Sequence, residues 1–165
     1  WLEGERDHLR NQYVEALLQR GVHETLRLHP ASPVAHRRAL APAVLRDGTR
    51  IPEGAFVVLD IAAANRDPRV FERPDEFDPL REVPDGVPRW GHAFGGGMHA
   101  CIGTELAGGV PEDGADQAHE QVLGTVTLML SALLNAGARP DPERPAQRDP
   151  GSQRDHFASY PVVFG

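Results

Sequence analysis

The stretch from Phe94 to Gly103, FGGGMHACIG, contains the chain's only cysteine, Cys101, shortly after three consecutive glycines. Because glycine lacks a Cβ, the backbone here can turn tightly and can lie close to a flat partner. A helix that starts at or just after Cys101 would direct its free amide groups and the positive end of its dipole at the sulfur, which favours the thiolate. The fold must therefore bring a tight turn, a thiol and a helix start together.

The residues of this loop leave several interpretations open: a nucleophilic cysteine, a zinc ligand, a ligand of a softer metal, or a buried cysteine beside a flexible turn. Zinc is disfavoured because the eight histidines are scattered, without the paired spacing of a closed zinc site. A nucleophilic cysteine needs a general base and an oxyanion hole, and no residue stands out as the base.

Composition excludes some functions. The 165 residues suffice for one domain with a core, and the net charge of −7 without a basic tract argues against nucleic-acid binding. The longest apolar run, Val122–Leu134, falls short of the roughly 20 residues that span a bilayer, so we expect no membrane association. With a single cysteine there is no internal disulfide, and a cytoplasmic location is expected. All 17 basic residues are arginine, which suggests a GC-rich bacterial genome.

Hydrophobic periodicity predicts a mainly α fold with small β-sheets (α+β). A helix is expected from Tyr13 to Leu28, short strands between residues 34 and 61, and an irregular segment over residues 65–103. A short helix through Ala107 is broken by GGVPEDG, and a second helix is expected from about Ala115 to Ala136. A polar loop over residues 139–155 and one closing strand, FASYPVVF, complete the chain.

The cysteine loop resembles the haem-binding loop of the cytochrome P-450 family, whose pattern is Phe-Gly-x-Gly-x-x-x-Cys-x-Gly. The matching positions are Phe94, Gly95, Gly97, Cys101 and Gly103. The resemblance implies that haem b (iron protoporphyrin IX) is the cofactor and that Cys101 is the axial thiolate ligand of its iron. It also implies that Phe94 packs beside the sulfur.

Two further motifs resemble the same family in the family's order. HETLRLHP resembles its Glu-x-x-Arg helix, with Glu24 and Arg27, and FDPLR supplies Arg81 as the third member of a Glu-Arg-Arg triad. Glu24 and Arg27 lie three residues apart on one helical face, so Arg81 could return from a loop to pin the carboxylate. Taken alone, Glu24 and Arg27 would be an ordinary solvated pair. The resemblance implies a structural triad.

The resemblance also implies donors for the haem propionates. His99 is one, and the other is an arginine on the first strand after the Glu-x-x-Arg helix. Arg38 is preferred over Arg37, and the alternation of side chains along a strand allows only one of them to face the haem. The segment ANRDPRVF resembles the family's loop after the last of these strands.

By this resemblance, residues 1–165 are a single incomplete domain, the C-terminal haem-binding portion of the cytochrome P-450 fold. Its parts would be the Glu-x-x-Arg helix region (1–30), the strand region (34–61), the meander and cysteine haem loop (65–103), and a last part (104–165). The last part holds the proximal helix, an interrupted loop, a second helix and a terminal strand. The distal helix and most of the substrate pocket have no counterpart, so no catalytic residue is predicted beyond the haem ligand.

The implied function is that of a haem-thiolate monooxygenase, represented here by its haem-binding portion. Expected partners are a ferredoxin- or flavodoxin-type electron donor and a small hydrophobic organic substrate, and the chain alone is expected to be inactive. The alternative is a non-catalytic remnant of the family that acts as a partner or activator protein. The enzyme is favoured by the joint retention of Cys101, Glu24, Arg27, Arg81 and His99, because a scaffold needs no thiolate. One departure is the sequence after Cys101, where LAGGVPEDG replaces the family's usual uninterrupted helix.

Overall fold

The computed structural model describes residues 2–110, 122–152, 154 and 156–165, with side chains described from residue 11 onward. The element order is α1 (Leu2–Leu28), β1 (Val34–Arg38), β2 (Ala43–Val44), β3 (Arg50–Ile51), β4 (Phe56–Asp60), α2 (Ile61–Ala64), the 3-10 turn η1 (Gly97–His99), α3 (Thr104–Gly108), α4 (Thr125–Asn135), β5 (Ala138–Pro140), β6 (Gln147–Arg148), β7 (Phe157–Ser159) and β8 (Val162–Phe164). Helices and small sheets are thus combined as predicted.

The first helix, α1, is longer than its periodicity predicted. It begins at Leu2, well before Tyr13, and ends at Leu28, close to the predicted stop before Pro30. The end follows from proline chemistry, because the residue before a proline is driven out of the helical region. The N-terminal half lacks a regular apolar stripe, which is why the sequence pattern did not reveal it.

Two antiparallel pairs of strands follow α1. In the pair β1–β4 the register runs from Val34 opposite Asp60 to Arg38 opposite Phe56, and β2 pairs with β3 beyond it. The strands are shorter than predicted. The helix α2 was not predicted; it begins directly after β4, where the Asp60 side chain accepts a hydrogen bond of 2.8 Å from the Ala63 amide as an N-cap.

The second half differs from the prediction at three places. Of the helix expected from about Ala115 to Ala136, residues 115–121 lie outside the described part. Within the described part, α4 begins at Thr125 with Gly124 as its N-cap, because Leu123 forms a bridge with Gly109. The expected polar loop contains β5 and β6, and the expected single closing strand consists of β7 and β8. β8 pairs with β5 and β7 pairs with β6, a long-range pairing that local patterns do not reveal.

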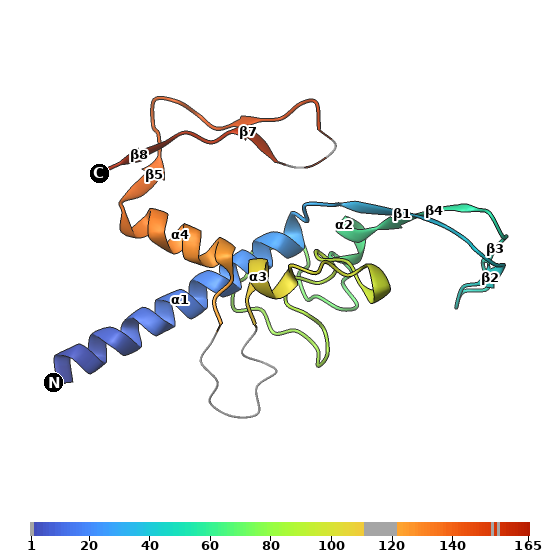
Figure 1. Cartoon of the computed structure of the whole chain (residues 1–165), viewed down its shortest axis with the longest axis horizontal. Coiled ribbons are helices and arrows are strands. Elements are labelled where there is room, and N and C mark those ends of the chain that lie inside the picture. Colours follow the sequence, from blue (N-terminus) through green and yellow to red (C-terminus); the bar gives the residue numbers. More distant parts are fainter. Residues whose placement is uncertain (1, 111–121, 153, 155) are drawn as a thin grey trace.

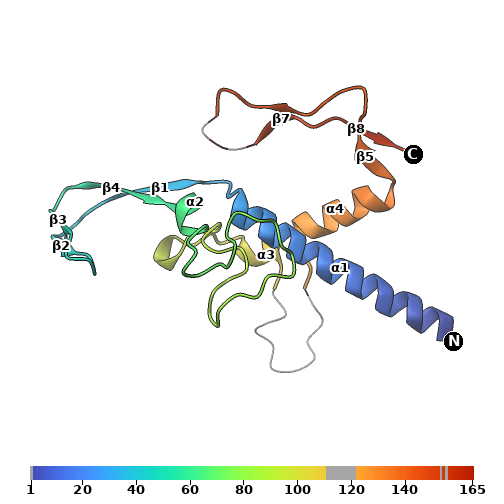
Figure 2. The same ribbon diagram turned by 180° about the vertical axis from the view of Figure 1, so that it is seen from behind.

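The centre of the molecule is the C-terminal half of α1, which packs against α3 and α4. Figures 1 and 2 show the β1–β4 ladder and the N-terminal end of α1 projecting to opposite sides of this centre, with the strands β5 to β8 forming an arch beyond α4. Among the described residues, few large apolar side chains are buried: Val22, Leu28, Phe71 and Trp90. The buried polar and charged side chains outnumber them: Gln19, His23, Glu24, Arg27, Asn65, Arg81 and Thr127.

The helix α4 is apolar on most of its surface, yet it is largely exposed. Its exposed apolar side chains include Val126, Leu128, Met129, Leu133 and Leu134. A helix that is apolar all round is normally covered by other parts of a protein. In the described part of the chain, no helix is both long and apolar enough to cross a membrane.

Candidate functional site

The cysteine loop is closed by a backbone hydrogen bond and depends on two of its glycines. The Cys101 amide donates to the Phe94 carbonyl at 2.8 Å, which brings the start and the end of the loop together. Gly95 and Gly97 have φ values of 73° and 62°, in the left-handed region that residues with a Cβ rarely adopt. Replacing either glycine would therefore strain the turn that carries the thiol.

The helix after the thiol starts later than predicted. α3 begins at Thr104 with Gly103 as its N-cap. The Thr104 amide and its hydroxyl both donate to the Cys101 carbonyl, at 3.3 Å and 2.7 Å, so the expectation that this amide points at the sulfur is wrong. A Cβ built on Gly103 would lie 3.8 Å from the Cys101 sulfur, so this glycine keeps the space beside the thiol open.

The donor chemistry of the loop suits a metal held by an organic ring. Cys101 is exposed, and so are the residues that flank it, Met98 and Ile102. The described residues contain no group of three or more His, Cys, Asp or Glu side chains that could together hold a metal. An iron whose equatorial ligands come from a macrocycle needs a single thiolate from the protein, and an open thiol on an apolar loop can provide it. The loop therefore fits haem.

Behind the loop, aromatic side chains connect it to α1. The rings of Phe94 and Trp90 meet edge to face with centroids 5.4 Å apart, and Trp90 meets the ring of His23 in the same way at 4.8 Å. Such edge-to-face pairs stabilise a packing arrangement beyond the area they bury. Phe94 is thus held from behind by a buried tryptophan, and its packing beside the sulfur stays a prediction.

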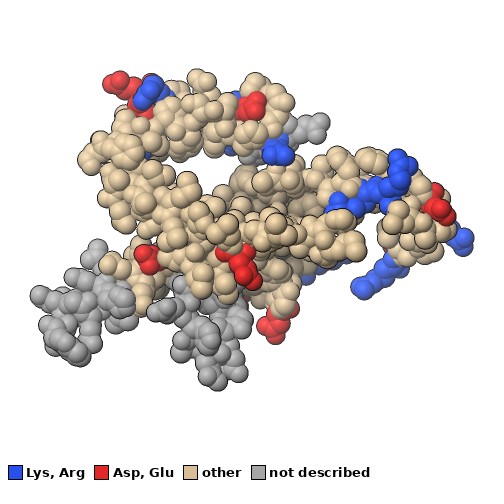
Figure 3. Space-filling model, in the orientation of Figure 1, with Lys and Arg blue, Asp and Glu red and all other residues tan. Residues whose placement is uncertain are grey.

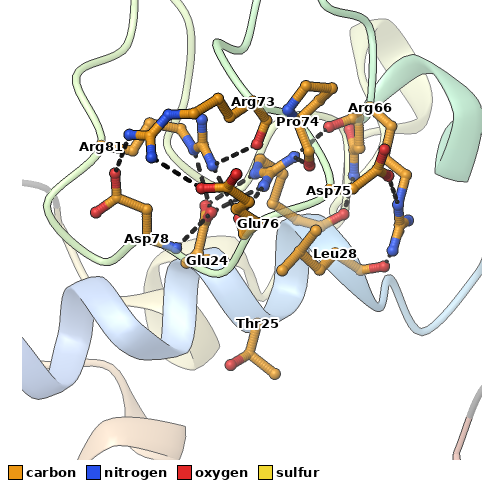
Figure 4. Close-up of polar contacts among 12 residues, drawn as sticks. Glu24, Thr25, Leu28, Arg66, Arg73, Pro74, Asp75, Glu76, Asp78 and Arg81 are labelled. Atoms are coloured by element: carbon orange, nitrogen blue, oxygen red, sulfur yellow. Dashed lines mark hydrogen bonds and ion pairs between the residues drawn. The ribbon is translucent and has the colours of Figure 1, made fainter.

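The structure brings Glu24, Arg27 and Arg81 together in a buried ion network. Arg27 donates to both carboxylate oxygens of Glu24, each at 2.8 Å, and Arg81 donates to Oε1 of Glu24 at 3.1 Å. The Asp78 amide adds a further hydrogen bond to Glu24 at 3.2 Å. Figure 4 shows this carboxylate facing the loop over α1, while Thr25 points away on the other side of the helix.

Both arginines use their remaining donors on the irregular segment after α2. Because a guanidinium has five N–H donors in a rigid fork, it can hold several backbone carbonyls in fixed positions. Arg27 reaches the carbonyls of Asn65 (2.6 Å), Pro74 (2.8 Å) and Glu76 (3.4 Å), and Arg81 those of Glu72, Arg73 (3.2 Å) and Glu76 (2.9 Å). The triad therefore folds a segment without regular secondary structure onto α1.

The pKa of Glu24 is lowered by this network. Burial by itself raises the pKa, and the hydrogen bond from Arg27, the Asp78 amide, the charge of Arg27 and the hydrogen bond from Arg81 together outweigh it. The ionised carboxylate therefore contributes stability above the pKa of the unfolded chain, about 4.5. That contribution is lost as the pH falls through the lower pKa of the folded state.

We expect this pH dependence to be removed by Glu24→Gln. The free energy of unfolding of the natural chain, measured by urea titration, should exceed that of the variant most above pH 4.5. The difference should shrink as the pH is lowered further, because protonation removes the same charge. Glu53→Gln is the control, because it makes the same change at an exposed carboxylate away from the triad. A difference between natural chain and variant that does not change with pH would contradict the assignment.

Asn65 connects the triad to the cysteine loop, and sequence reasoning missed it. It is fully buried, its Nδ2 donates to the Arg27 carbonyl at 3.0 Å, and its Oδ1 accepts from the His92 amide at 2.7 Å. Gly91 lies so close that a Cβ there would collide with the Asn65 side chain. The signal was the segment ANRDPRVF, whose resemblance to a family loop did not say which residue matters.

Gln19 and His23 are further buried polar residues that the sequence did not single out. With Arg27 they recur every four residues on one face of α1, and each contacts a different later segment. Gln19 donates to the Val122 carbonyl at 3.3 Å and accepts from the Gly124 amide at 2.8 Å. The spacing of Gln19, His23 and Arg27 was the available signal.

The two predicted propionate donors are exposed. Arg38 lies at the end of β1, donates to the Gly54 carbonyl at 2.9 Å, and points to the opposite face of the strand from Arg37. His99 ends the turn η1 in the cysteine loop. Figure 3 shows arginine side chains gathered over the β1–β4 region, where the exposed arginines are Arg37, Arg38, Arg46 and Arg50.

Comparisons with known proteins agree with the geometry. A model of the cytochrome P450 family matches residues 15–108, more than half of the chain. Cytochrome P450 4A6 of Oryctolagus cuniculus is 33% identical over 132 residues, which are 78% of this chain and 23% of that protein. Luteothin monooxygenase of Streptomyces thioluteus is 43% identical over 93 residues, 55% of this chain and 21% of that protein. The chain thus spans about a fifth of the length of these curated relatives.

Solved structures show the same fold. CYP154A1 from Streptomyces coelicolor A3(2) matches with a TM-score of 0.68 and 30% identity, covering 90% of this chain and 33% of that one. P450BioI, solved in complex with an acyl carrier protein ligated to hexadec-9Z-enoic acid, matches with a TM-score of 0.70 and 25% identity, covering 99% of this chain and 37% of that one. With its helices and small sheets corresponding to part of that fold, the chain belongs to the cytochrome P450 family.

Proposed function

We propose that this chain forms the thiolate side of the haem site of a monooxygenase, a member of the cytochrome P450 family that oxidises a small hydrophobic organic substrate. The observation that carries the proposal is the exposed thiol of Cys101 on a loop closed by its own backbone and left open by glycines. The family model covers this loop, which supports Cys101 as the ligand.

In this proposal each part of the chain has a distinct task. Haem b, when bound, supplies the activation of oxygen, and a thiolate ligand supports that chemistry by donating electron density to the iron. Cys101 would hold the iron, and Phe94, supported by the ring of Trp90, would pack beside the sulfur. Arg38 and His99 donate hydrogen bonds to the propionates, for which a guanidinium and an imidazole are suited. The triad of Glu24, Arg27 and Arg81 keeps the supporting segment in place and takes no part in the reaction.

Electrons would come from a ferredoxin- or flavodoxin-type protein, and the location expected from the single cysteine is the cytoplasm. Residues 1–165 contain no counterpart of the distal helix, so the chain alone should not hydroxylate a substrate. No observation favours the alternative of a non-catalytic remnant or activator protein.

Cys101→Ser tests the proposal. In protein loaded with haem, we expect the natural chain to give the absorption spectrum of a thiolate-ligated haem after reduction and addition of carbon monoxide, and the variant to lose it. Ile102→Ser is the matched control, because it introduces the same hydroxyl on the neighbouring, fully exposed position. If Cys101→Ser keeps the thiolate spectrum, Cys101 is not the ligand and the proposal fails.

A further inference from the structure

His23 is a buried polar residue of α1 with a defined proton position. Its side chain is 1% exposed, and its Nε2 lies 2.5 Å from the carbonyl oxygen of Gly108. Because a carbonyl can only accept, the imidazole carries a proton on Nε2 and donates it. Gly108 is the last residue of α3, where carbonyls have no partner within the helix. His23 therefore caps the end of the helix that follows Cys101.

The same imidazole also contacts the residues that precede Cys101. Its ring meets Trp90 edge to face with centroids 4.8 Å apart, and Trp90 meets Phe94 likewise at 5.4 Å. The Phe94 carbonyl accepts the hydrogen bond from the Cys101 amide that closes the loop. His23 is thus connected to the start of the cysteine loop through two packed aromatic rings.

The two ends of the segment 94–108, which contains the cysteine loop and α3, lie close together beside His23. A Cβ built on Gly108 would lie 3.2 Å from Cε2 of Phe94 and 3.6 Å from Cζ3 of Trp90. The contact with Trp90 would be an ordinary one, but the ring of Phe94 would have to shift slightly, so a glycine lets α3 end this close to Phe94. Because Cys101 lies between Phe94 and Gly108 in the chain, the segment that carries the thiol is held at both ends by contacts that converge on His23.

We propose that His23 is a positioning residue for Cys101: it fixes both ends of the 94–108 segment and thereby sets where the sulfur stands relative to a bound haem. The statement about haem rests on the proposed function, whereas the statement about the loop rests on the described contacts alone. The donor on Nε2 is the essential group, since it bonds to the C-terminal end of the segment at Gly108, and the ring contact with Trp90 adds packing.

Paired variants separate these two contributions. His23→Phe keeps a ring against Trp90 and removes the donor, whereas His23→Gln supplies an amide N–H that can reach the Gly108 carbonyl. Gln19→Leu is the matched control, because Gln19 is equally buried four residues earlier on the same face of α1 but bonds to Val110, Val122 and Gly124, which lie outside the 94–108 segment. Thr25→Ala, on the opposite and exposed face, controls for changes to α1 itself.

Hydrogen exchange in the chain without haem gives the first readout. In His23→Phe we expect the amides of Cys101 and of residues 104–109 to exchange about tenfold faster, the loss expected when a buried hydrogen bond is removed. His23→Gln should restore most of the protection, while the amide of Asp78 in the triad region should not change. Unchanged exchange of the 94–109 segment in His23→Phe overturns the proposal.

The haem spectrum gives the second readout. At equal haem loading, after reduction and addition of carbon monoxide, His23→Phe should lower the fraction of bound haem that shows the thiolate-type spectrum. His23→Gln should restore that fraction. Gln19→Leu should keep that fraction even if it lowers overall stability. An equal loss in Gln19→Leu and His23→Phe would show that His23 is merely structural. If the natural chain gives no thiolate spectrum, the proposed function fails, and the exchange result alone decides the role of His23.

Discussion

Glu24→Ala is expected to cost the chain about 3–5 kcal/mol of unfolding free energy, the loss typical when one partner of a buried ion network is removed. The side chains of Arg27 and Arg81 are 0% and 4% exposed, and each would keep its charge with no carboxylate beside it. Native domains are stable by only about 5–15 kcal/mol, so this loss removes a large share of the unfolding free energy of a small domain.

The measurement is the free energy of unfolding from urea titration, with far-ultraviolet circular dichroism as the readout of α1. Thr25→Ala is the matched control: Thr25 is the next residue on α1, but it is exposed and its hydroxyl donates only to the Gly21 carbonyl. It should change stability by less than about 1 kcal/mol. A Glu24→Ala chain that folds with unchanged stability and takes up haem normally would show that the triad does not hold the fold.

Gly124→Ala is expected to be strongly disruptive, although Gly124 has φ −70°, a backbone conformation that alanine adopts readily. The backbone of Gly124 crosses that of α3's end so closely that an added Cβ would lie 2.5 Å from the Gly108 carbonyl carbon and 2.5 Å from the Gly109 nitrogen. Those neighbours are backbone atoms and cannot turn away, so the crossing must open. Overpacking of this kind costs typically about 1–3 kcal/mol and sometimes more.

Gly96→Ala is the control for this substitution. Gly96 has φ −167°, an extended backbone that any residue adopts, and a Cβ there would meet nothing within 4 Å. We expect its unfolding free energy to match that of the natural chain, whereas Gly124→Ala should also lose the hydrogen bond between the Gly124 amide and Gln19. Equal stability of the two variants would mean that the crossing yields easily and does not hold α3 against α4.

The predicted parts of the fold are those that depend on short-range patterns. The end of α1 before Pro30 and the short helix after Cys101 each follow from residues that restrict the backbone within a few positions. The parts that were missed depend on distant partners. β5 and β6 exist because β8 and β7 supply their hydrogen bonds, and α4 starts at Thr125 because Gly109 pairs with Leu123.

The same division holds for the site. Cys101, Phe94 and the glycines of the loop stand in one short motif, so the sequence was sufficient to select them. Asn65, Gln19 and His23 acquire their importance only from burial, since an amide or an imidazole on a helix is usually exposed to water. Their partners lie 27 to 105 residues away in the chain, too far for any local pattern to indicate.

By itself, the sequence determined the family, the thiol and the identity of the charged triad, because each rests on residue types at set spacings. Tertiary structure alone decided how these parts are joined. It showed that Arg27 and Arg81 order an irregular segment by binding its carbonyls. It also showed that Asn65 joins Arg27 to His92 just before the cysteine loop, and that His23 bonds to Gly108 after it. The physical reason is that a buried polar group must find its hydrogen-bond partner wherever the folded chain supplies one, irrespective of distance along the sequence.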